Sequence, residues 1–167
     1  MRRKSFQGLE CCIARAVDVV GDPWTLLILR NAFLGARKFS DFEQALGIPS
    51  STLTRRLNDL TEKELLTNVR YEEHPPRLDY ELTERARDLF PLLLILADWG
   101  AKWLSPAGAP LELIDACSEQ AVEPRVIDRR TGRRLRLGEV ALRPGLGASA
   151  ELRALFCGRS VVFGGAA

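Results

Sequence analysis

Two short helical patterns joined by a tight turn occupy residues 39–60, and this arrangement limits the folds open to the chain more than any other feature. The first pattern begins with a capping box, in which Ser40 is the expected N-cap and Glu43 stands three residues later. Residues 47–49, Gly-Ile-Pro, form the joint, and a second helix follows over residues 50–60. Helices of these lengths with a short glycine-containing joint are typical of a helix-turn-helix.

The second helix, which we expect to begin with Ser50 or Ser51 as its cap, has two chemically different faces. Three leucines at helical spacing form the apolar side: Leu53, Leu57 and Leu60. The opposite side carries hydroxyl groups, an amide and two guanidinium groups: Ser51, Thr52, Thr54, Arg55, Arg56 and Asn58. In many proteins such a face is simply solvated. It also suits the major groove of DNA, because Ser and Thr let a helix approach closely and Arg55 or Arg56 can make a bidentate contact to guanine.

Two places beside this face suit DNA phosphates. Free N–H groups at residues 50–52 favour an anion at the start of the helix, so Ser50 joins the expected DNA contacts. Lys38 stands just before the first of the two helices and is a second candidate for a phosphate contact. The residue types alone do not show which of Arg55 and Arg56 contacts a base and which contacts a phosphate.

Beyond Leu66 the spacing of apolar residues changes from helical to alternating. Val69 and Tyr71 alternate with polar residues, and so do the apolar residues of the stretch 78–82. The connection between the two runs, residues 74–77, contains two adjacent prolines. We therefore predict a two-stranded hairpin, and a hairpin directly after a helix-turn-helix makes a winged helix.

The predicted wing carries both attractive and repulsive groups for DNA. Arg77 at its tip suits a minor groove or a phosphate, and Arg70 is placed to assist. Glu72 and Glu73 lie beside them and would repel DNA unless they face away. His74 is expected to be an exposed turn residue.

Helices are also expected on both sides of the winged helix. Residues 9–20 and the segment from Asp22 to Leu34 precede it, each with apolar residues at helical spacing. After the hairpin, Thr83 caps a further helix, and a break is expected at Pro91. The helix that continues over residues 92–104 is more apolar than the outer helix of a small domain needs to be, so we expect a second copy of the chain to cover it.

The C-terminal third of the chain has a different composition. Residues 105–110 are typical of a linker, residues 111–145 form an expected small β-rich module, and residues 146–167 are expected to be loosely ordered. The strands predicted in the module are residues 111–114, 121–128 and 133–140. The predicted fold class is thus mainly α with a β-hairpin wing (α+β). Residues 1–104 form the winged helix-turn-helix domain with flanking dimerisation helices, and a small C-terminal β-rich tail follows.

The charge of the chain is too small to indicate a polyanionic partner by itself. The formal net charge is +2, and residues 1–104 hold as many Lys and Arg as Asp and Glu residues. This balance favours an alternative function, a winged-helix protein-interaction adaptor that does not bind DNA. An enzyme is a third alternative without support, since the chain has a single histidine, His74, and no pattern of a nucleophile with a base or of a phosphate-binding loop. We predict that the protein is not an enzyme.

The sequence shows no targeting signal, which predicts a cytoplasmic protein. The spacing of its cysteines predicts no cofactor. The first residues are basic but lack the apolar run of a signal peptide, and the longest apolar run, residues 92–97, is far too short to span a membrane. The cysteines Cys11, Cys12, Cys117 and Cys157 follow neither a disulfide framework nor a zinc pattern, so no metal site is expected. Arg15 stands one helical turn after Cys11 and can stabilise a thiolate, although a cysteine on an apolar helix is usually just a small buried group.

Several short motifs together resemble the HxlR-type bacterial transcription regulators, over about residues 9–104. The most specific motifs are Cys11-x-Ile-Ala-Arg-Ala, Gly-x-x-Trp-Thr-Leu-Leu-Ile-Leu-Arg at residues 21–30, Phe-Ser-Asp-Phe at residues 39–42, Pro-Pro-Arg at residues 75–77 and Asp-Trp-Gly at residues 98–100. The resemblance implies a winged-helix homodimer that dimerises through its first and last helices and binds operator DNA.

Two further expectations depend on this resemblance. Some members of the family sense electrophiles or oxidants through an N-terminal cysteine, and the position of Cys11 matches it, so an electrophile or another small molecule is the implied effector. Many relatives with a C-terminal extension carry cysteine pairs suggestive of a zinc ribbon, whereas this chain has only Cys117 at a comparable place. We therefore expect a repressor that reads a palindromic operator through residues 50–60 and the Pro-Pro-Arg wing, with a β-module that binds no metal.

Overall fold

The computed structural model describes residues 5–73 and 76–164, without the side chains of residues 70–77. The chain divides into two units, residues 1–121 and residues 122–167. Within the described part, all core residues that are fully buried lie in the first unit. The domain limits expected from the sequence, including a linker at residues 105–110, remain a prediction.

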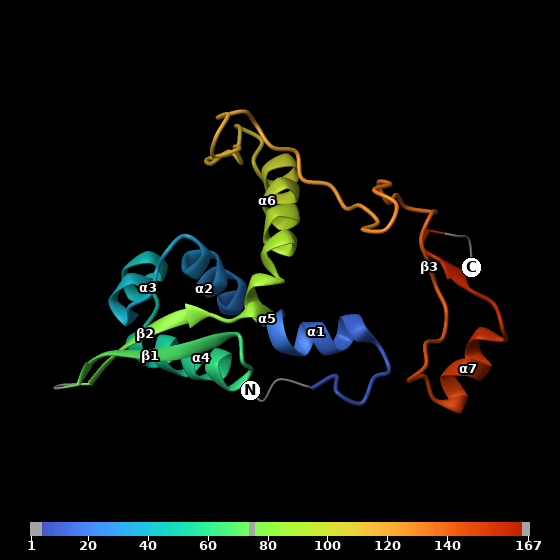
Figure 1. Cartoon of the computed structure of the whole chain (residues 1–167), viewed down its shortest axis with the longest axis horizontal. Helices are drawn as coiled ribbons and strands as arrows, with labels where there is room; N and C mark the ends of the chain where they lie inside the picture. Colours follow the sequence, from blue (N-terminus) through green and yellow to red (C-terminus); the bar gives the residue numbers. More distant parts are fainter. Residues whose placement is uncertain (1–4, 74–75, 165–167) are drawn as a thin grey trace. The chain divides into compact units, whose positions relative to one another are not determined.

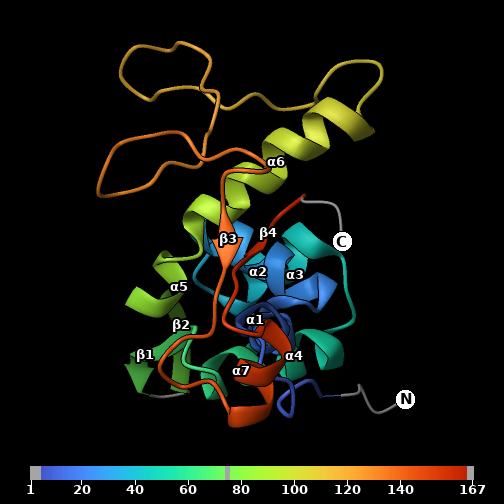
Figure 2. The ribbon, with the colours of Figure 1, turned by 90° about the vertical axis from the view of Figure 1, so that its right-hand side faces the viewer.

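Three helices pack together as the centre of the first unit, and Figure 1 and Figure 2 both show them side by side. They are α2 (Pro23–Phe33), α3 (Phe39–Leu46) and α4 (Ser50–Glu62). Their core consists of side chains with almost no exposed area: Ile28, Leu29, Phe42, Leu53, Leu57 and Leu60. The helix-turn-helix prediction is confirmed, and Gly47 makes the turn with a positive φ of 60° that favours glycine.

The helix starts depend on capping groups, and only some of them match those predicted from the sequence. Asp22 caps α2 as its position before Pro23 suggests, since its Oδ1 accepts the N–H of Trp24 at 3.0 Å. In α3 the prediction of Ser40 as the N-cap is wrong, because the helix begins at Phe39. The carboxylate of Asp41 accepts the backbone N–H groups that precede the helix.

The start of α4 also differs from the expectation. Pro49 occupies the N-cap position, so neither Ser50 nor Ser51 caps the helix. The hydroxyl of Ser50 instead donates to the carboxylate of Glu43 on α3. Pro49 has the extended backbone that precedes a helix, with φ −56° and ψ 137°, and its side chain has no group that can accept an N–H.

The hairpin consists of β1 (Leu66–Glu73) and β2 (Pro76–Leu82), paired antiparallel with Leu66 opposite Leu82. The register is irregular between Arg70 and Glu72. The hairpin is held to the helices near Tyr80, whose ring lies edge-on to Phe42 with 6.2 Å between centroids. This confirms the winged-helix fold that was predicted from the alternating pattern.

Helices flank the winged helix on both sides, as expected. α1 (Cys12–Val20) precedes it, and α5 (Glu84–Arg87) and α6 (Phe90–Leu104) follow it. The hydroxyl of Thr83 accepts the N–H of Ala86 and caps α5 as predicted. The break falls at residues 88–89, and Pro91 takes the second position of α6, where its missing N–H costs nothing.

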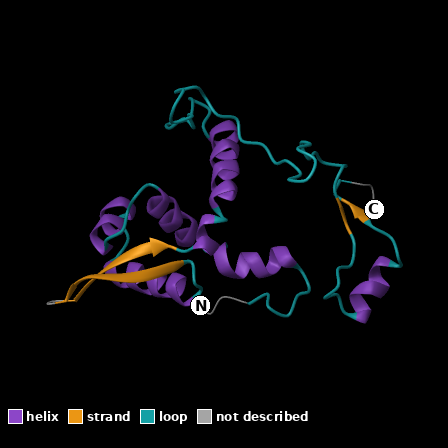
Figure 3. Cartoon of the chain, viewed as in Figure 1, coloured by secondary structure: helices purple, strands orange, loops and turns teal. Residues whose placement is uncertain are grey.

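The C-terminal region contains less strand than predicted, as Figure 3 shows. Of the three expected strands, residues 111–140 show only single bridges, Ile114 to Ala121 and Ile127 to Arg134. The two short strands that do pair are β3 (Ala141–Leu142) and β4 (Val161–Val162). Between them lies α7 (Ala150–Phe156), a helix that the glycine-rich and alanine-rich sequence did not predict.

Candidate nucleic-acid interface

The helix α4 presents one buried and one exposed face. Leu53, Leu57 and Leu60 are at most 1% exposed, and they fix how the helix lies against α2 and the hairpin. A helix turns by about 100° per residue, so the positions opposite this apolar face are those of Ser51, Arg55 and Asn58. All three of these side chains are exposed, and so is Thr54.

Arg55 lies at the centre of the exposed face. Within the part of the chain that the structure describes, its guanidinium group makes no ion pair. Asn58 lies one turn further along the same face and is exposed, although the sequence reading did not select it as a site residue. Its amide can pair with the edge of adenine, so its position relative to Arg55 was the available signal.

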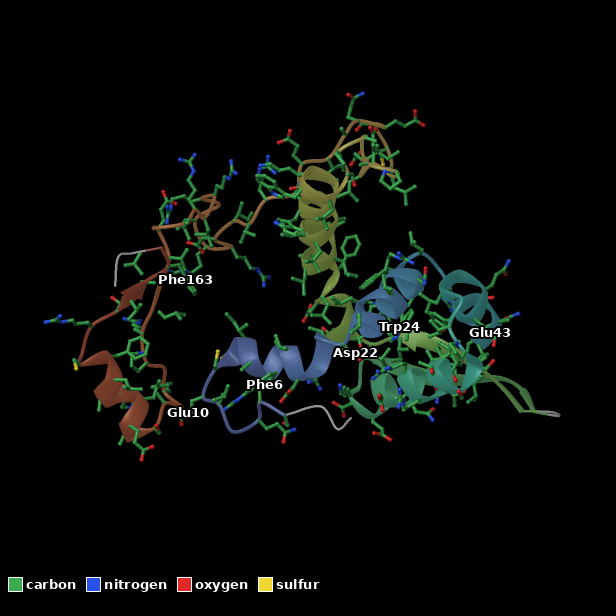
Figure 4. All side chains as sticks on the ribbon, turned by 180° about the vertical axis from the view of Figure 1, so that it is seen from behind. Phe6, Glu10, Asp22, Trp24, Glu43 and Phe163 are labelled. Carbon is green, nitrogen blue, oxygen red and sulfur yellow. The ribbon has the colours of Figure 1, made fainter. Side chains whose placement is uncertain are left out.

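Arg56 points to a different environment from Arg55. Its NH2 group lies 2.8 Å from Oδ2 of Asp22, and its NH1 group lies 3.5 Å from Oδ2 of Asp59. The side chain of Arg56 is 22% exposed and that of Asp22 is 12% exposed. Asp22 lies where α1 ends and α2 begins (Figure 4), so this ion pair ties α4 to the start of α2.

The N-terminus of α4 is less open to an anion than expected. The N–H groups of Thr52 and Leu53 already donate to the carbonyl of Pro49, at 2.9 and 3.0 Å. The carboxylate of Glu43 accepts the hydroxyl of Ser50, which adds a negative charge at the same end. Thr54 donates to the carbonyl of Ser50 at 2.8 Å, which leaves the oxygen of its hydroxyl to accept a further hydrogen bond.

Lys38 lies at the start of α3, beside the edge of the hairpin. Its side chain is exposed, and its backbone forms a single bridge with Asp79 of β2. The backbone N–H groups of Lys38 and Arg37 donate to Oδ2 of Asp41 at 2.9 and 3.1 Å. These two hydrogen bonds hold the pKa of Asp41 below its ordinary value, so this carboxylate is charged near neutral pH.

The wing residues are placed by their backbone alone. Arg70 belongs to β1 and Arg77 to β2, and they lie close to the turn of the hairpin. Their side chains are outside what the structure describes, and His74 is outside the described residues altogether. Both arginines therefore remain predicted DNA contacts.

The cysteine that was predicted to sense thiol-reactive compounds is accessible. Cys11 occupies the N-cap position of α1, and the side chains of Cys11 and Cys12 are both exposed. Cys117 and Cys157 are exposed as well and are not joined to another cysteine. Among the described residues, no group of three or more His, Cys, Asp and Glu side chains could hold a metal ion.

Two helices carry rows of exposed apolar side chains. On α6 the row follows the positions i, i+4, i+7 and i+11, which share one face of a helix: Leu92, Leu96, Trp99 and Trp103, exposed by 41%, 41%, 52% and 63%. Ile13 and Val17 form a similar pair on α1, with Leu9 just before the helix. Neither α1 nor α6 has a buried residue.

No helix of the described residues has the length and apolar character that crossing a lipid bilayer requires.

Comparisons with known proteins agree with this architecture. A family model described as HxlR-like helix-turn-helix matches residues 19–108. An uncharacterized HTH-type transcriptional regulator of Mycobacterium tuberculosis strain H37Rv, Rv3095, is 42% identical over 149 residues, which cover 88% of this chain and 92% of that relative.

Solved structures show the same fold. The crystal structure of PA1607, described as a candidate transcription factor, superposes with a TM-score of 0.76 at 31% identity, over 85% of this chain and 100% of that chain. The redox regulator HypR in its reduced form gives a TM-score of 0.52 at 27% identity, over 55% of this chain and 92% of that chain. The winged helix, the matched family model and the relative of nearly full length together establish that the chain belongs to the HxlR family of helix-turn-helix transcriptional regulators.

Proposed function

We propose that the protein is a homodimeric repressor that inserts α4 of each subunit into the major groove of a palindromic operator. The observation that carries this proposal is the exposed face of α4, where Ser51, Thr54, Arg55 and Asn58 are open to solvent while the leucines of the same helix are buried. A major groove admits one helix and presents each base pair as a distinct pattern of donors and acceptors.

The residues of the interface have different roles in this proposal. Arg55 reads a guanine, and Asn58 reads a neighbouring base. The short side chains of Ser51, Thr52 and Thr54 let the helix approach. Arg56 holds α4 in position through Asp22 instead of reading DNA, because contact with a base would require breaking an ion pair that is largely shielded from water.

Contacts with the DNA backbone come from both ends of the winged helix. Lys38 lies at the start of α3 with its side chain exposed, which suits a phosphate. Arg70 and Arg77 are placed in the hairpin near its tip, where an arginine can reach a phosphate or the minor groove. Ser50 is the weakest of the proposed phosphate contacts, because its hydroxyl is held by Glu43.

The homodimer is supported by the apolar rows on α1 and α6. The row on α6 exposes a large apolar surface along one helix face, and contact of this surface with water is unfavourable for an isolated subunit. The row consists of Leu92, Leu96, Trp99 and Trp103. A second copy that packs against this row places the two α4 helices about a symmetry axis. Such a dimer reads two inverted half-sites about one helical turn apart, roughly 34–36 Å.

Repression is the simpler of the two regulatory modes for this chain. A dimer that occupies DNA overlapping a promoter blocks transcription by its presence alone, whereas activation needs an additional contact with the polymerase. Because the proposed regulator binds DNA, it acts in the cytoplasm, where the DNA of a bacterial cell lies.

Cys11 is the proposed sensor of electrophiles or oxidants. Its thiol is exposed at the start of α1, one of the two helices of the proposed dimer interface. The fold is similar to that of HypR, which is described as a redox regulator. Treatment with diamide is expected to change the DNA affinity of the wild type and of Cys12→Ser, and to leave that of Cys11→Ser unchanged.

Binding isotherms on duplex DNA at several salt concentrations test the central proposal. Each phosphate contact contributes about 0.9 to the slope of log K against log salt concentration, so a DNA-binding protein loses affinity steeply as salt rises. Arg55→Ala is expected to lose the preference for operator over scrambled duplex, with Arg87→Ala on α5 as a control. Weak binding that is independent of salt and sequence would favour the protein-interaction adaptor instead.

A further inference from the structure

A pocket of about 300 Å³ lies in the first unit, away from the exposed face of α4. Its lining is mostly apolar, and two arginine side chains contribute to it. Its lining includes Val19, Val20, Leu65, Leu89, Arg15 and Arg85. These residues come from α1, the residue before β1, helix α5 and the break before α6. We infer that this pocket binds a small organic carboxylate with an apolar body.

The two arginines give the pocket a positive charge that little else offsets. Arg85 lies 3.4 Å from a carboxylate oxygen of Glu64, but the two side chains are 55% and 80% exposed, so the attraction is weak. The guanidinium of Arg15 makes no ion pair within the described ranges. The nearby carboxylate of Asp18 on α1 is engaged by the Ser5 hydroxyl and the Phe6 N–H, at 3.0 and 2.7 Å.

The size and lining of the pocket define the class of ligand. Ligand pockets measure roughly 300–1,000 Å³, so this one suits a small molecule and not a drug-sized one. The apolar walls favour an alkyl or aryl body, and a guanidinium pairs with a carboxylate through two parallel hydrogen bonds. A medium-chain fatty acid or an aromatic acid combines both features.

A helix of a second copy is the alternative occupant. The exposed apolar row of α1 contains Ile13 and Val17, whereas the pocket is lined by Arg15, Val19 and Val20. At about 100° per residue, Arg15 and Val19 lie on a different side of α1 from Ile13 and Val17, but Val20 lies on the same side as they do. The two arginines of the pocket favour a carboxylate over an apolar helix as its occupant.

The pocket also touches the segment that follows α4. Nζ of Lys63, the residue directly after α4, donates to the carbonyls of Asp18 and Val19 at 3.1 and 3.3 Å. Val19 and Leu65 both line the pocket. A ligand there contacts both sides of the junction between α1 and the end of α4. It is therefore placed to change DNA affinity, and this regulatory part of the inference rests on the proposed function.

Calorimetric titration of the full chain with octanoate, in the absence of DNA, tests the site. We expect saturable binding, weakened on the order of tenfold by Arg15→Gln and by Arg85→Gln. Arg87→Gln, on the same short helix but outside the pocket, is expected to bind as the wild type does. Glu64→Gln removes the competing carboxylate and is expected to strengthen binding, which keeps the test valid if an arginine variant fails to fold.

Three results would overturn the site. They are an absence of octanoate binding to the wild type, equally tight binding of uncharged 1-octanol, and dissociation of a dimer into monomers on octanoate binding. The last result would assign the pocket to the subunit interface. In a separate measurement, saturating octanoate is expected to change DNA affinity by about fivefold or more. Unchanged DNA affinity would refute the regulatory part, whereas a failure of DNA binding itself would refute the proposed function and leave the titration result standing.

Discussion

Arg55 and Arg56 are neighbours in the sequence, but α4 places them in different surroundings. The composition of residues 50–60 gave both arginines the same expected role on DNA. The helical geometry separates them, because Arg56 lies about 60° from the centre of the buried face and Arg55 lies nearly opposite it. The partner of Arg56 is Asp22, which is distant in sequence, so no local pattern could have identified the ion pair.

Replacing Arg56 and Arg55 one at a time separates the effect of each on stability from its effect on DNA recognition. Arg56→Ala is expected to lower the free energy of unfolding by roughly 1–3 kcal/mol, because it leaves a mostly buried carboxylate of Asp22 without its partner. Arg55→Ala is expected to change this free energy by less than about 0.5 kcal/mol. Urea unfolding monitored by circular dichroism measures both.

A double-mutant cycle with Asp22→Asn provides the control for this pair. Asparagine keeps an oxygen for the N–H of Trp24, so the cap of α2 is retained while the charge is lost. An interaction energy of at least about 0.5 kcal/mol is expected for two residues in direct contact. Unchanged stability of Arg56→Ala together with lost DNA binding would instead show that Arg56 reads the DNA.

The second prediction concerns the cap of α3 and its dependence on pH. Asp41→Ala is expected to cost about 0.5–2 kcal/mol of unfolding free energy near neutral pH, as the loss of a helix cap does. The pKa of Asp41 is lowered in the folded protein by the N–H groups of Lys38 and Arg37. Its stabilising effect is therefore fully present above the unfolded pKa of about 3.9 and is lost as the pH falls through the lower folded pKa.

Thermal unfolding of wild type and variant between about pH 3 and pH 7 measures this effect. The difference between the two proteins should shrink toward the acidic end. Ser40→Ala is the comparison variant, since Ser40 is the cap that the sequence pattern suggested. It removes only the smallest of the contributions that lower the pKa of Asp41, and it is expected to cost less than about 0.5 kcal/mol. A larger loss for Ser40→Ala than for Asp41→Ala would contradict the capping found in the structure.

Among the helices and strands, apolar patterns that reflect burial predicted the structure correctly. Patterns that rest on weak local signals did not. The helix-turn-helix and the hairpin follow from strong periodicity and from Gly47 and the prolines of the joint and the turn. Residues 121–128 and 133–140 were predicted to be strands, but only single bridges form there among the described residues. A short stretch without a buried face does not hold a strand together.

The helix α7 formed where the sequence pattern predicted no regular element. Ser149 accepts the N–H of Leu152 with its hydroxyl and caps the helix, but the surrounding glycine and alanine residues suggested little order. The cap itself was visible in the sequence, as Ser149 followed by Glu151 in the first turn. A short helix without a buried residue gives no hydrophobic period to detect.

The third prediction tests the apolar row of α6. Replacing Trp99 and Trp103 together with glutamate is expected to convert a dimer into monomers, because charged side chains cannot be buried in the proposed interface. The subunit itself should stay folded, since these two side chains are 52% and 63% exposed. Sedimentation velocity measures the change in mass.

Leu34→Glu serves as the control for this variant. Leu34 is 77% exposed at the end of α2 and belongs to neither apolar row. We expect this variant to remain dimeric. If the wild type itself sediments as a monomer at micromolar concentration, the proposed dimer is wrong.

For the molecule as a whole, the small net charge of +2 neither supports nor excludes a DNA partner, so the placement of the individual charges decides how it would meet DNA. The fold arranges an uncharged and basic strip along one side of α4, while Arg56 is neutralised by Asp22. Bulk composition could not reveal this arrangement, because it counts every arginine alike. The family resemblance indicated the class of protein, and the matched family model and the relative of nearly full length confirm that family.

Selection of bound duplexes from a randomised DNA pool tests the central claim most directly. The wild type is expected to enrich an inverted repeat whose half-sites lie about one helical turn, roughly 10 base pairs, apart. Arg55→Ala is expected to relax the preference at one position of each half-site and to leave the other positions unchanged. Enrichment of no motif by the wild type, or of the same motif with equal strength by Arg55→Ala, would contradict the proposal that α4 reads DNA.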